Sequence, residues 1–356
     1  MSAPLPFPKS DHFDGNHFFT PRAPRPAALR DVLKWRLGKN RSRPAPWPKW
    51  VEITPRALPP RPAAGSPDII ATWINHSTFL LQTAAANILL DPVFSRCCGP
   101  LGKLGPPRAH APGITLDALP RIDIVCLSHD HYDHCDIPTL RHLARRDAPL
   151  GITPLGNGTL LRRAAFAPDR IIELDWWQSC ELNIPAPNTN RSGISQSKIE
   201  NPKSKIHLTP AQHWSNRLTG GRNRRLWGGF FITFPPPSAT AGSPARAIYF
   251  AGDTGYHATI FRDIAARLGP PDLALLPIGA YEPRWFMSPQ HCNPAEAVRI
   301  HCDLRSRQSI AMHWGTFQLT DEPRDAPPRA LAQALRDANL PPHVFKVLAP
   351  GESLTI

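Results

Sequence analysis

Short apolar runs alternate with polar turn segments along most of this chain. From residue 68 onward each run is bounded by residues typical of turns, such as glycine, proline, asparagine and aspartate. Runs of this length and setting predict buried β-strands. We expect strands at 68–75, 78–82, 87–91, 122–127, 149–153, 170–174, 178–184, 205–209, 227–234, 246–251, 273–276, 308–312 and 344–348.

Helices are predicted between some of these strands, where apolar residues recur three and four positions apart. We expect helices after Asp136, at 256–268, after the capping-box sequence Asn293–Glu296 and near 328–338. Mixed strands followed by outer helices, in two halves, predict an α/β protein. The architecture that fits this order is a four-layer αβ/βα sandwich.

The first 67 residues differ in composition from the rest. They are rich in proline and basic residues. We therefore predict two parts, a proline-rich basic N-terminal arm at 1–67 and one large domain at 68–356. Two further proline-rich or polar segments, 185–204 and 235–246, are expected to be surface loops.

Residues 27–37 of the arm show helical periodicity. The apolar positions are Leu29, Val32, Leu33 and Leu37, and the basic ones are Arg30, Lys34 and Arg36. Two interpretations stay open. The helix packs its apolar stripe on the domain, or it rests as a basic amphipathic segment on anionic lipid.

The composition limits the kinds of partner and the cellular compartment that we expect. The formal net charge of +13 favours a polyanionic partner, either phospholipid or nucleic acid. The excess charge lies mainly in the arm and loops, without a basic groove interleaved with aromatics, so we expect no nucleic-acid partner.

Seven cysteines without a Cys-x-x-Cys pair indicate thiols of a reducing compartment. With no apolar segment resembling a signal peptide or membrane span, we expect a cytoplasmic protein, free or peripheral to a membrane.

The most informative motif is Ser-His-Asp-His-Tyr-Asp-His at 128–134. It follows the apolar run 122–127, so it lies in the loop at a strand's end. Its donor side chains are His129, His131, Asp133 and His134. Imidazoles and carboxylates suit zinc and similar metals, although iron or manganese would accept the same donors. Four donors exceed what one catalytic metal needs, which predicts two metals.

Three further donors also follow apolar runs. They are His213, Asp253 and His313. A lone histidine in such a place is more often a structural hydrogen-bonding group, and an aspartate before glycine-type residues usually makes a turn. The donor cluster at 128–134 makes a metal-binding role more probable than a structural one for these three residues. A dinuclear site needs about three more donors, one of them bridging.

The motif and its downstream donors resemble the metallo-β-lactamase fold hydrolases. Within them, the segments 209–214, 252–256, 277–287, 293–301 and 313–317 resemble the family of N-acyl-phosphatidylethanolamine-hydrolysing phospholipases D. The resemblance runs from about residue 68 to the C-terminus. The chain departs from the family pattern at 185–204, at 235–246 and in the arm.

The resemblance implies a ligand set and a pocket residue. One zinc would be held by His129, His131 and His213, the other by Asp133, His134 and His313, with Asp253 bridging. It places His291 close to the substrate pocket. For protonation of the leaving group, His291 and a metal-bound water are both candidates. Asp91 would orient the ligand loop.

Three residues have uncertain roles from sequence alone. Arg284 and Trp285 could contact a phosphate or head group, since arginine binds phosphate oxygens bidentately. The alternative is that Arg284 and Glu282 brace their own loop. His76 could line the far side of the site, although a supporting or core role is more common for such a residue.

The reaction that this resemblance implies is phosphodiester hydrolysis in a phospholipid, with water activated by two metals. The expected products are N-acylethanolamine and phosphatidic acid, and Asp133, Asp253 and His291 are the expected catalytic residues. The alternatives are a lactonase or another phosphodiesterase of the same superfamily, or a binding protein on a retired hydrolase scaffold. The last is disfavoured because all seven donors are present.

Overall fold

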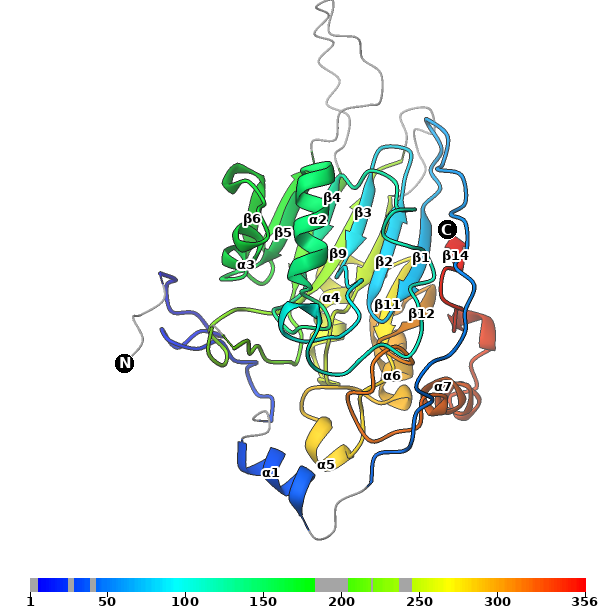
Figure 1. Ribbon diagram of the computed structural model, residues 1–356. Coiled ribbons are helices and arrows are strands. Elements are labelled where there is room, and N and C mark those ends of the chain that lie inside the picture. Colours follow the sequence, from blue (N-terminus) through cyan, green and yellow to red (C-terminus); the bar gives the residue numbers. More distant parts are fainter. Residues whose placement is uncertain (1–5, 25–28, 39–42, 183–203, 219, 237–244) are drawn as a thin grey trace, which may run out of the picture.

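Two seven-stranded sheets pack face to face, with helices on both outer faces (Figure 1). The computed structural model describes residues 6–24, 29–38, 43–182, 204–218, 220–236 and 245–356. The α/β sandwich expected from the sequence is confirmed. Most of the segments 185–204 and 235–246 lie outside the described residues.

The first sheet holds the N-terminal half of the domain. Its strand order is β14 (Ser353–Thr355), β1 (Ile70–Asn75), β2 (Thr78–Gln82), β3 (Asn87–Leu90), β4 (Ile124–Cys126), β5 (Leu150–Pro154) and β6 (Ile171–Leu174). The strands from β14 to β3 pair antiparallel, and those from β3 to β6 pair parallel. Helices α2 (Ile137–Asp147) and α3 (Gly158–Arg163) cover its outer face.

The second sheet mirrors this arrangement. Its order is β13 (Phe345–Lys346), β12 (Gln308–Met312), β11 (Leu273–Pro277), β10 (Arg246–Phe250), β9 (Gly229–Phe234), β8 (Ser204–Thr209) and β7 (Ser179–Leu182). The strands from β10 to β13 pair parallel, and those from β7 to β10 antiparallel. Helices α4 (Ile260–Leu268), α6 (Pro294–Leu304) and α7 (Ala326–Asp337) complete the fourth layer.

The layers follow from the strands' alternation of side chains. In β2, Phe79 and Leu81 point into the core between the sheets, while Leu80 packs with Leu140 and Leu143 of α2. Successive residues of a strand face opposite sides, so a strand buried on both faces reads as a continuous apolar run. This is why the apolar runs alone were enough to find the central strands.

The helix expected after Asn293 begins as predicted. The Asn293 side chain accepts a hydrogen bond from the Glu296 amide at 2.8 Å, and the Glu296 carboxylate accepts one from the Asn293 amide at 2.9 Å. This capping box satisfies two amides that an α-helix otherwise leaves without partners.

Some short elements differ from the prediction. The strand expected at 344–348 is limited to β13, and the edge strand β14 at the C-terminus was not predicted. Helix α3 and the four-residue helix α5 (Arg284–Met287) were also missed. Elements of this length contain too few residues for a period to be recognised.

The described parts of the arm lie along the domain (Figure 1). The Val51 amide donates to the Ala109 carbonyl and the Arg56 amide to the Gly113 carbonyl, both at 2.7 Å. Backbone hydrogen bonds of this kind attach the arm as an extended segment without making it a sheet strand. No helix in the described part of the chain combines the length and apolarity needed to cross a membrane.

The arm's helix, α1 (Leu29–Leu37), contacts the domain through Trp35 and, from the predicted stripe, through Val32. The Trp35 ring is buried 4.8 Å from Phe286 of α5, and its Nε1 donates to Asp321 at 2.8 Å. Leu33 and Leu37, by contrast, are 50% and 74% exposed. The packing interpretation therefore holds for Trp35, while two residues of the apolar stripe face solvent.

The start of the arm is anchored by a buried histidine. The His12 ring stacks on Trp176 at 4.4 Å, and its Nε2 lies 2.7 Å from Asp175. Burial acts to lower the pKa of His12, but hydrogen bonds to Asp175 and Asp11 outweigh it and raise the pKa above its ordinary value. A protonated His12 thus favours the docked arm.

We predict that His12→Gln destabilises the protein more at pH 5.5 than at pH 8.5. A pKa raised by folding stabilises the native state below the ordinary value of 6.5, and this contribution is lost as pH rises through the folded pKa. The expected loss at pH 5.5 is about 1.5–3 kcal/mol, the range for hydrogen bonds to charged groups. Denaturant unfolding at both pH values measures it. His17→Gln, at an exposed arm position, is the control, and equal losses at both pH values would contradict the charged pair.

Candidate metal centre

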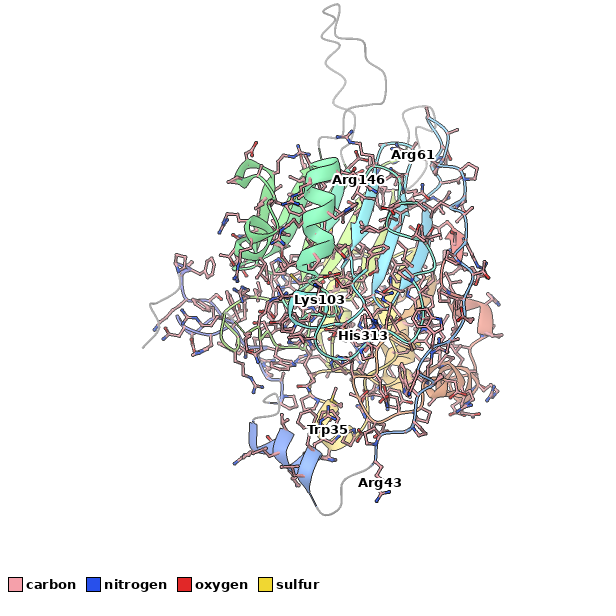
Figure 2. All side chains as sticks on the ribbon, in the orientation of Figure 1. Trp35, Arg43, Arg61, Lys103, Arg146 and His313 are labelled. Atoms are coloured by element: carbon pink, nitrogen blue, oxygen red, sulfur yellow. The ribbon has the colours of Figure 1, made fainter. Side chains whose placement is uncertain are left out.

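All seven predicted donors lie at one edge of the sandwich, because each follows the end of a strand. The 128–134 loop follows β4, and His213, Asp253 and His313 follow β8, β10 and β12. These last three strands run in the same direction, so their ends meet at the same edge. Figure 2 shows His313 in the interior, at the ends of the strands.

The Asp253 carboxylate lies at the centre of the donors. Its Oδ2 is 3.1 Å from Nε2 of both His134 and His313. The same oxygen is 3.8 Å from Nε2 of both His129 and His213. One carboxylate therefore faces histidines from both halves of the ligand set, which is the position a bridging ligand needs.

The donor atoms form two main groups, within each of which all atoms lie inside 4.8 Å of one another. The first group is His129, His131, His213 and Asp253, and the second is His76, Asp133, His134 and His313. This division matches the two triads expected from the resemblance. The addition is His76, whose Nε2 is 3.0 Å from the Asp133 carboxylate.

The imidazoles are held by hydrogen bonds behind them. Nδ1 of His134 lies 2.6 Å from Asp91, which is buried completely. Nδ1 of His213 lies 2.8 Å from the Gln290 carbonyl, and Nδ1 of His129 lies 2.9 Å from the Ser128 hydroxyl. Such partners fix the ring orientation and leave Nε2 free to coordinate. Asp91 thus has the supporting position that the resemblance implied.

The donor set fits divalent cations. Nε2 of His134 and His313 and Oδ1 of Asp253 are buried and have no hydrogen-bond partner among the described residues. Buried polar atoms without partners cost free energy unless something compensates them. Imidazole nitrogens and carboxylate oxygens are ligands for zinc and related metals. Two cations at these two groups would satisfy the lone pairs.

The ionisation of Asp253, His129 and His213 agrees with this assignment. Burial acts to raise the pKa of Asp253, but the surrounding histidines outweigh it and hold that pKa well below its usual range. Burial and neighbouring histidines lower the pKa of His129 well below its usual range. Burial lowers the pKa of His213 to about 3. A charged carboxylate and neutral imidazoles are the forms that bind metal. Burial acts to lower the pKa of His134 and His313, but the carboxylates of Asp253 and Asp133 outweigh it and raise both pKa values above the usual range, so a bound cation would displace a proton from each ring.

A cavity of about 460 Å³ opens beside the donors. Its lining includes His131, Asp133, Asp253 and His291. Nδ1 of His291 lies 3.9 Å from the Asp253 carboxylate. The structure therefore brings His291 to the cavity wall, close to the donors, as the resemblance implied.

Arg284 and Trp285 lie elsewhere. The Arg284 guanidinium donates to both carboxylate oxygens of Glu296, at 2.8 and 2.9 Å, and to the His291 carbonyl. Among the described residues, Glu282 accepts a hydrogen bond from the Arg284 backbone amide and none from its guanidinium. Neither Arg284 nor Trp285 lines the cavity. This geometry supports a bracing role for Arg284, with Glu296 as the partner in place of the expected Glu282.

The described chain also supplies contacts that the sequence did not indicate. Val32 and Trp35 of α1 form part of the cavity wall. The Glu322 carboxylate accepts hydrogen bonds from the amides of Ala280 and Glu282, which holds the loop before α5. Nothing in a single sequence marks Glu322, because its partners are backbone amides distant along the chain.

A model of the β-lactamase superfamily domain matches residues 86–314, which is more than half of the chain. The chain belongs to the metallo-β-lactamase superfamily. The matched span includes every one of the seven donors, and their convergence agrees with a metal-dependent hydrolase.

Proteins with similar sequences indicate which members of the superfamily this chain resembles. A Caenorhabditis elegans N-acyl-phosphatidylethanolamine-hydrolyzing phospholipase D is 34% identical over 275 residues, covering 76% of this chain and 70% of the relative. The mitochondrial Saccharomyces cerevisiae protein of the same description is also 34% identical, over 70% of this chain but 48% of the relative. An uncharacterized Mycobacterium tuberculosis protein is 38% identical over 85% of this chain and 76% of its own length.

Solved structures agree on the fold. An isothiocyanate hydrolase from Delia radicum gut bacteria has a TM-score of 0.55 at 19% identity, covering 80% of this chain and 98% of that one. The metallo hydrolase Igni18 from Ignicoccus hospitalis has a TM-score of 0.54 at 22% identity, covering 81% and 98%. At sequence identities this low, the structural similarity supports the same fold and nothing about the reaction.

We predict graded metal losses in two variants. Asp253→Ala should lose at least one equivalent of bound metal, because it removes the carboxylate that faces both donor groups. Asp91→Asn should keep the ligands but bind metal about 10–100-fold more weakly, since it loosens His134. Metal analysis after equilibrium dialysis measures both. Asp263→Ala on α4 is the control, and full metal content in Asp253→Ala with an intact fold would refute the bridging position.

Proposed function

We propose that this protein is a dinuclear zinc hydrolase that cleaves a phosphodiester bond in a phospholipid. The substrate is N-acylphosphatidylethanolamine, and the products are N-acylethanolamine and phosphatidic acid. Water adds to phosphorus, the bond from phosphorus to the ethanolamine oxygen breaks, and that oxygen takes up a proton. The homology to two phospholipases D of this specificity supports the choice among superfamily reactions.

The observation that carries the proposal is an apolar cavity placed directly against the donor cluster. Val32, Trp35, Phe286, Met287 and Leu319 line it together with the donors. Pockets for drug-sized ligands measure about 300–1,000 Å³. A cavity of about 460 Å³ therefore takes the head group and adjoining apolar atoms of a lipid, and the acyl chains extend outside it.

Zinc is the metal that we infer from the donors. His129, His131 and His213 would hold one ion, and Asp133, His134 and His313 the other, with Asp253 shared. Two such ions supply positive charge for the phosphate oxygens and lower the pKa of water, which makes a nucleophile available near neutral pH.

The chain's own residues position the reactants. Asp253 keeps both donor groups at one place, and Asp133 accepts from His76 and faces His313 across 3.3 Å. His291 stands at the cavity wall with its Nδ1 unpaired among the described residues. Burial holds the pKa of His291 well below its usual range, so its ring is neutral near pH 7. We assign His291 to accept the proton that the attacking water loses and to pass it to the departing oxygen.

We predict that the zinc-loaded protein releases N-acylethanolamine from N-acylphosphatidylethanolamine in mixed micelles. Chelation should abolish the release, and added zinc should restore it. His291→Gln should lower kcat by about 10²–10⁴-fold while metal content stays at two equivalents, as expected for the loss of a proton donor. Mass spectrometry of the products measures all three effects.

The same assay needs a panel of substrates. Phosphatidylcholine, unacylated phosphatidylethanolamine and an acyl lactone are the comparison compounds. Hydrolysis of the lactone with no phosphodiester cleavage would assign the site to carbonyl attack and reject the phospholipase proposal.

The exposed face of α1 is the surface through which we propose that the protein meets the lipid. Leu33 and Leu37 point outward, one helical turn apart, beside Lys34. Nζ of Lys34 lies 5.0 Å from the ring of Trp285, which is 51% exposed. Apolar side chains beside basic ones suit an anionic interface. Because Trp35 on the same helix lines the cavity, this surface adjoins the site.

We predict that the double variant Leu33→Gln/Leu37→Gln binds anionic vesicles about tenfold or more weakly, since each lost apolar side chain contributes to interfacial binding. Its hydrolysis of a short soluble phosphodiester should equal that of the parent. Vesicle co-sedimentation and a chromogenic assay measure the two effects. Leu104→Gln, also exposed, serves as the control. Unchanged vesicle binding in the double variant would reject this surface.

A further inference from the structure

The cavity beside the donors contains one basic side chain of lysine or arginine type among its described lining residues. This residue is Arg222. An anionic substrate needs compensation for its charge beyond what the donor cluster supplies, because the cavity also exposes the carboxylates of Asp133 and Asp253. The position of Arg222 is therefore relevant to which substrates the site accepts.

Arg222 reaches the cavity from the segment that follows the donor His213. Its guanidinium carbon lies 4.8 Å from the ring centre of Trp214, and that ring lies 4.7 Å from the ring of His131. The guanidinium thus stacks on an aromatic side chain that itself contacts a predicted ligand. Stacking leaves the edge of the guanidinium, where its N–H groups are, free to donate.

The segment carrying Arg222 is fixed at its base. The Asn223 amide donates to the Ser215 carbonyl at 2.7 Å, and the Ser215 hydroxyl donates to the Arg225 carbonyl at 2.6 Å. Arg225 forms an ion pair with Asp130 at 3.2 Å. Asp130 belongs to the 128–134 loop, so the loop with four donors and the segment with Arg222 are joined directly. Such support holds a binding residue in place before substrate arrives.

Arg222 has no carboxylate partner within ion-pair distance in the described part of the chain, unlike Arg225 or Arg284. The nearest acidic influence on it comes from Asp31 of α1. Burial lowers the pKa of Arg222 somewhat, and the charge of Asp31 acts in the opposite direction. An arginine remains charged at neutral pH under such shifts. The cavity therefore contains a partly buried cation with unused donors.

We propose that Arg222 binds the non-bridging phosphate oxygen of an anionic substrate, and so selects phosphodiesters over neutral esters and lactones. This inference rests on the proposed phosphodiesterase function and deepens it. It assigns the phosphate contact to Arg222 in place of Arg284, whose donors are occupied by Glu296. Arg222 would bind the substrate, whereas the hydrolysis itself would depend on the donor cluster.

The test uses zinc-loaded full-length protein and three variants, Arg222→Gln, Arg222→Lys and Arg162→Gln. Arg162 is an exposed arginine of α3 and controls for the change of net charge. Two chromogenic substrates are compared, the anionic bis(4-nitrophenyl) phosphate and the neutral 4-nitrophenyl acetate. Binding of inorganic phosphate is measured by calorimetry. Circular dichroism and metal analysis establish that each variant is folded and loaded.

Arg222→Gln should raise KM for the anionic substrate and Kd for inorganic phosphate by about tenfold or more, the size of effect expected for a hydrogen bond to a charged group. Its kcat should change less than KM, because ground-state binding is what is lost. Turnover of the neutral ester should stay within twofold of the parent. Arg222→Lys should recover part of the loss, and Arg162→Gln should match the parent.

Equal losses on the anionic and neutral substrates, or an unchanged phosphate Kd in folded Arg222→Gln, would overturn the assignment of Arg222. Failure of the parent protein on every phosphodiester would overturn the proposed function instead. In that case, comparing the phosphate Kd of the parent and of Arg222→Gln still shows whether Arg222 binds an anion. Failure of the Arg222 assignment can therefore be told apart from failure of the proposed function.

Discussion

The interaction on which this site depends is the approach of one buried carboxylate to four imidazoles from three different loops. Oδ2 of Asp253 lies within 4 Å of Nε2 in His129, His134, His213 and His313. Without a compensating charge, burying so many polar atoms would make the free energy of folding less favourable. The sandwich tolerates the arrangement because its strand ends deliver the donors and Asp91, Ser128 and Gln290 hold the rings. Structure and chemistry are thus coupled at one edge of the two sheets.

Much of this was accessible from the sequence, for a physical reason. Central strands are buried on both faces, so they appear as apolar runs, and a donor after such a run lies at a sheet edge. That rule located His213, Asp253 and His313 as well as the 128–134 loop. The resemblance to a known family then grouped the donors, and the structure brings the same residues together.

What the sequence could not supply were contacts between side chains distant along the chain. Arg284 was interpreted as a phosphate contact or a partner of Glu282, whereas its guanidinium binds Glu296 on the next helix. Nothing in the sequence singled out Arg222, yet it lines the cavity. The helix at 27–37 was found from its period, but period alone could not show that Trp35 faces the site while Leu33 faces solvent. These outcomes depend on tertiary packing, which local patterns do not encode.

The central claim is that the seven donors hold two metal ions that share Asp253. Anomalous X-ray diffraction from zinc-loaded crystals, recorded on both sides of the zinc absorption edge, tests it most directly. We expect two anomalous peaks, one among His129, His131 and His213 and one among Asp133, His134 and His313, with the Asp253 carboxylate between them. A single peak, or two peaks with Asp253 contacting neither or only one, would contradict the account.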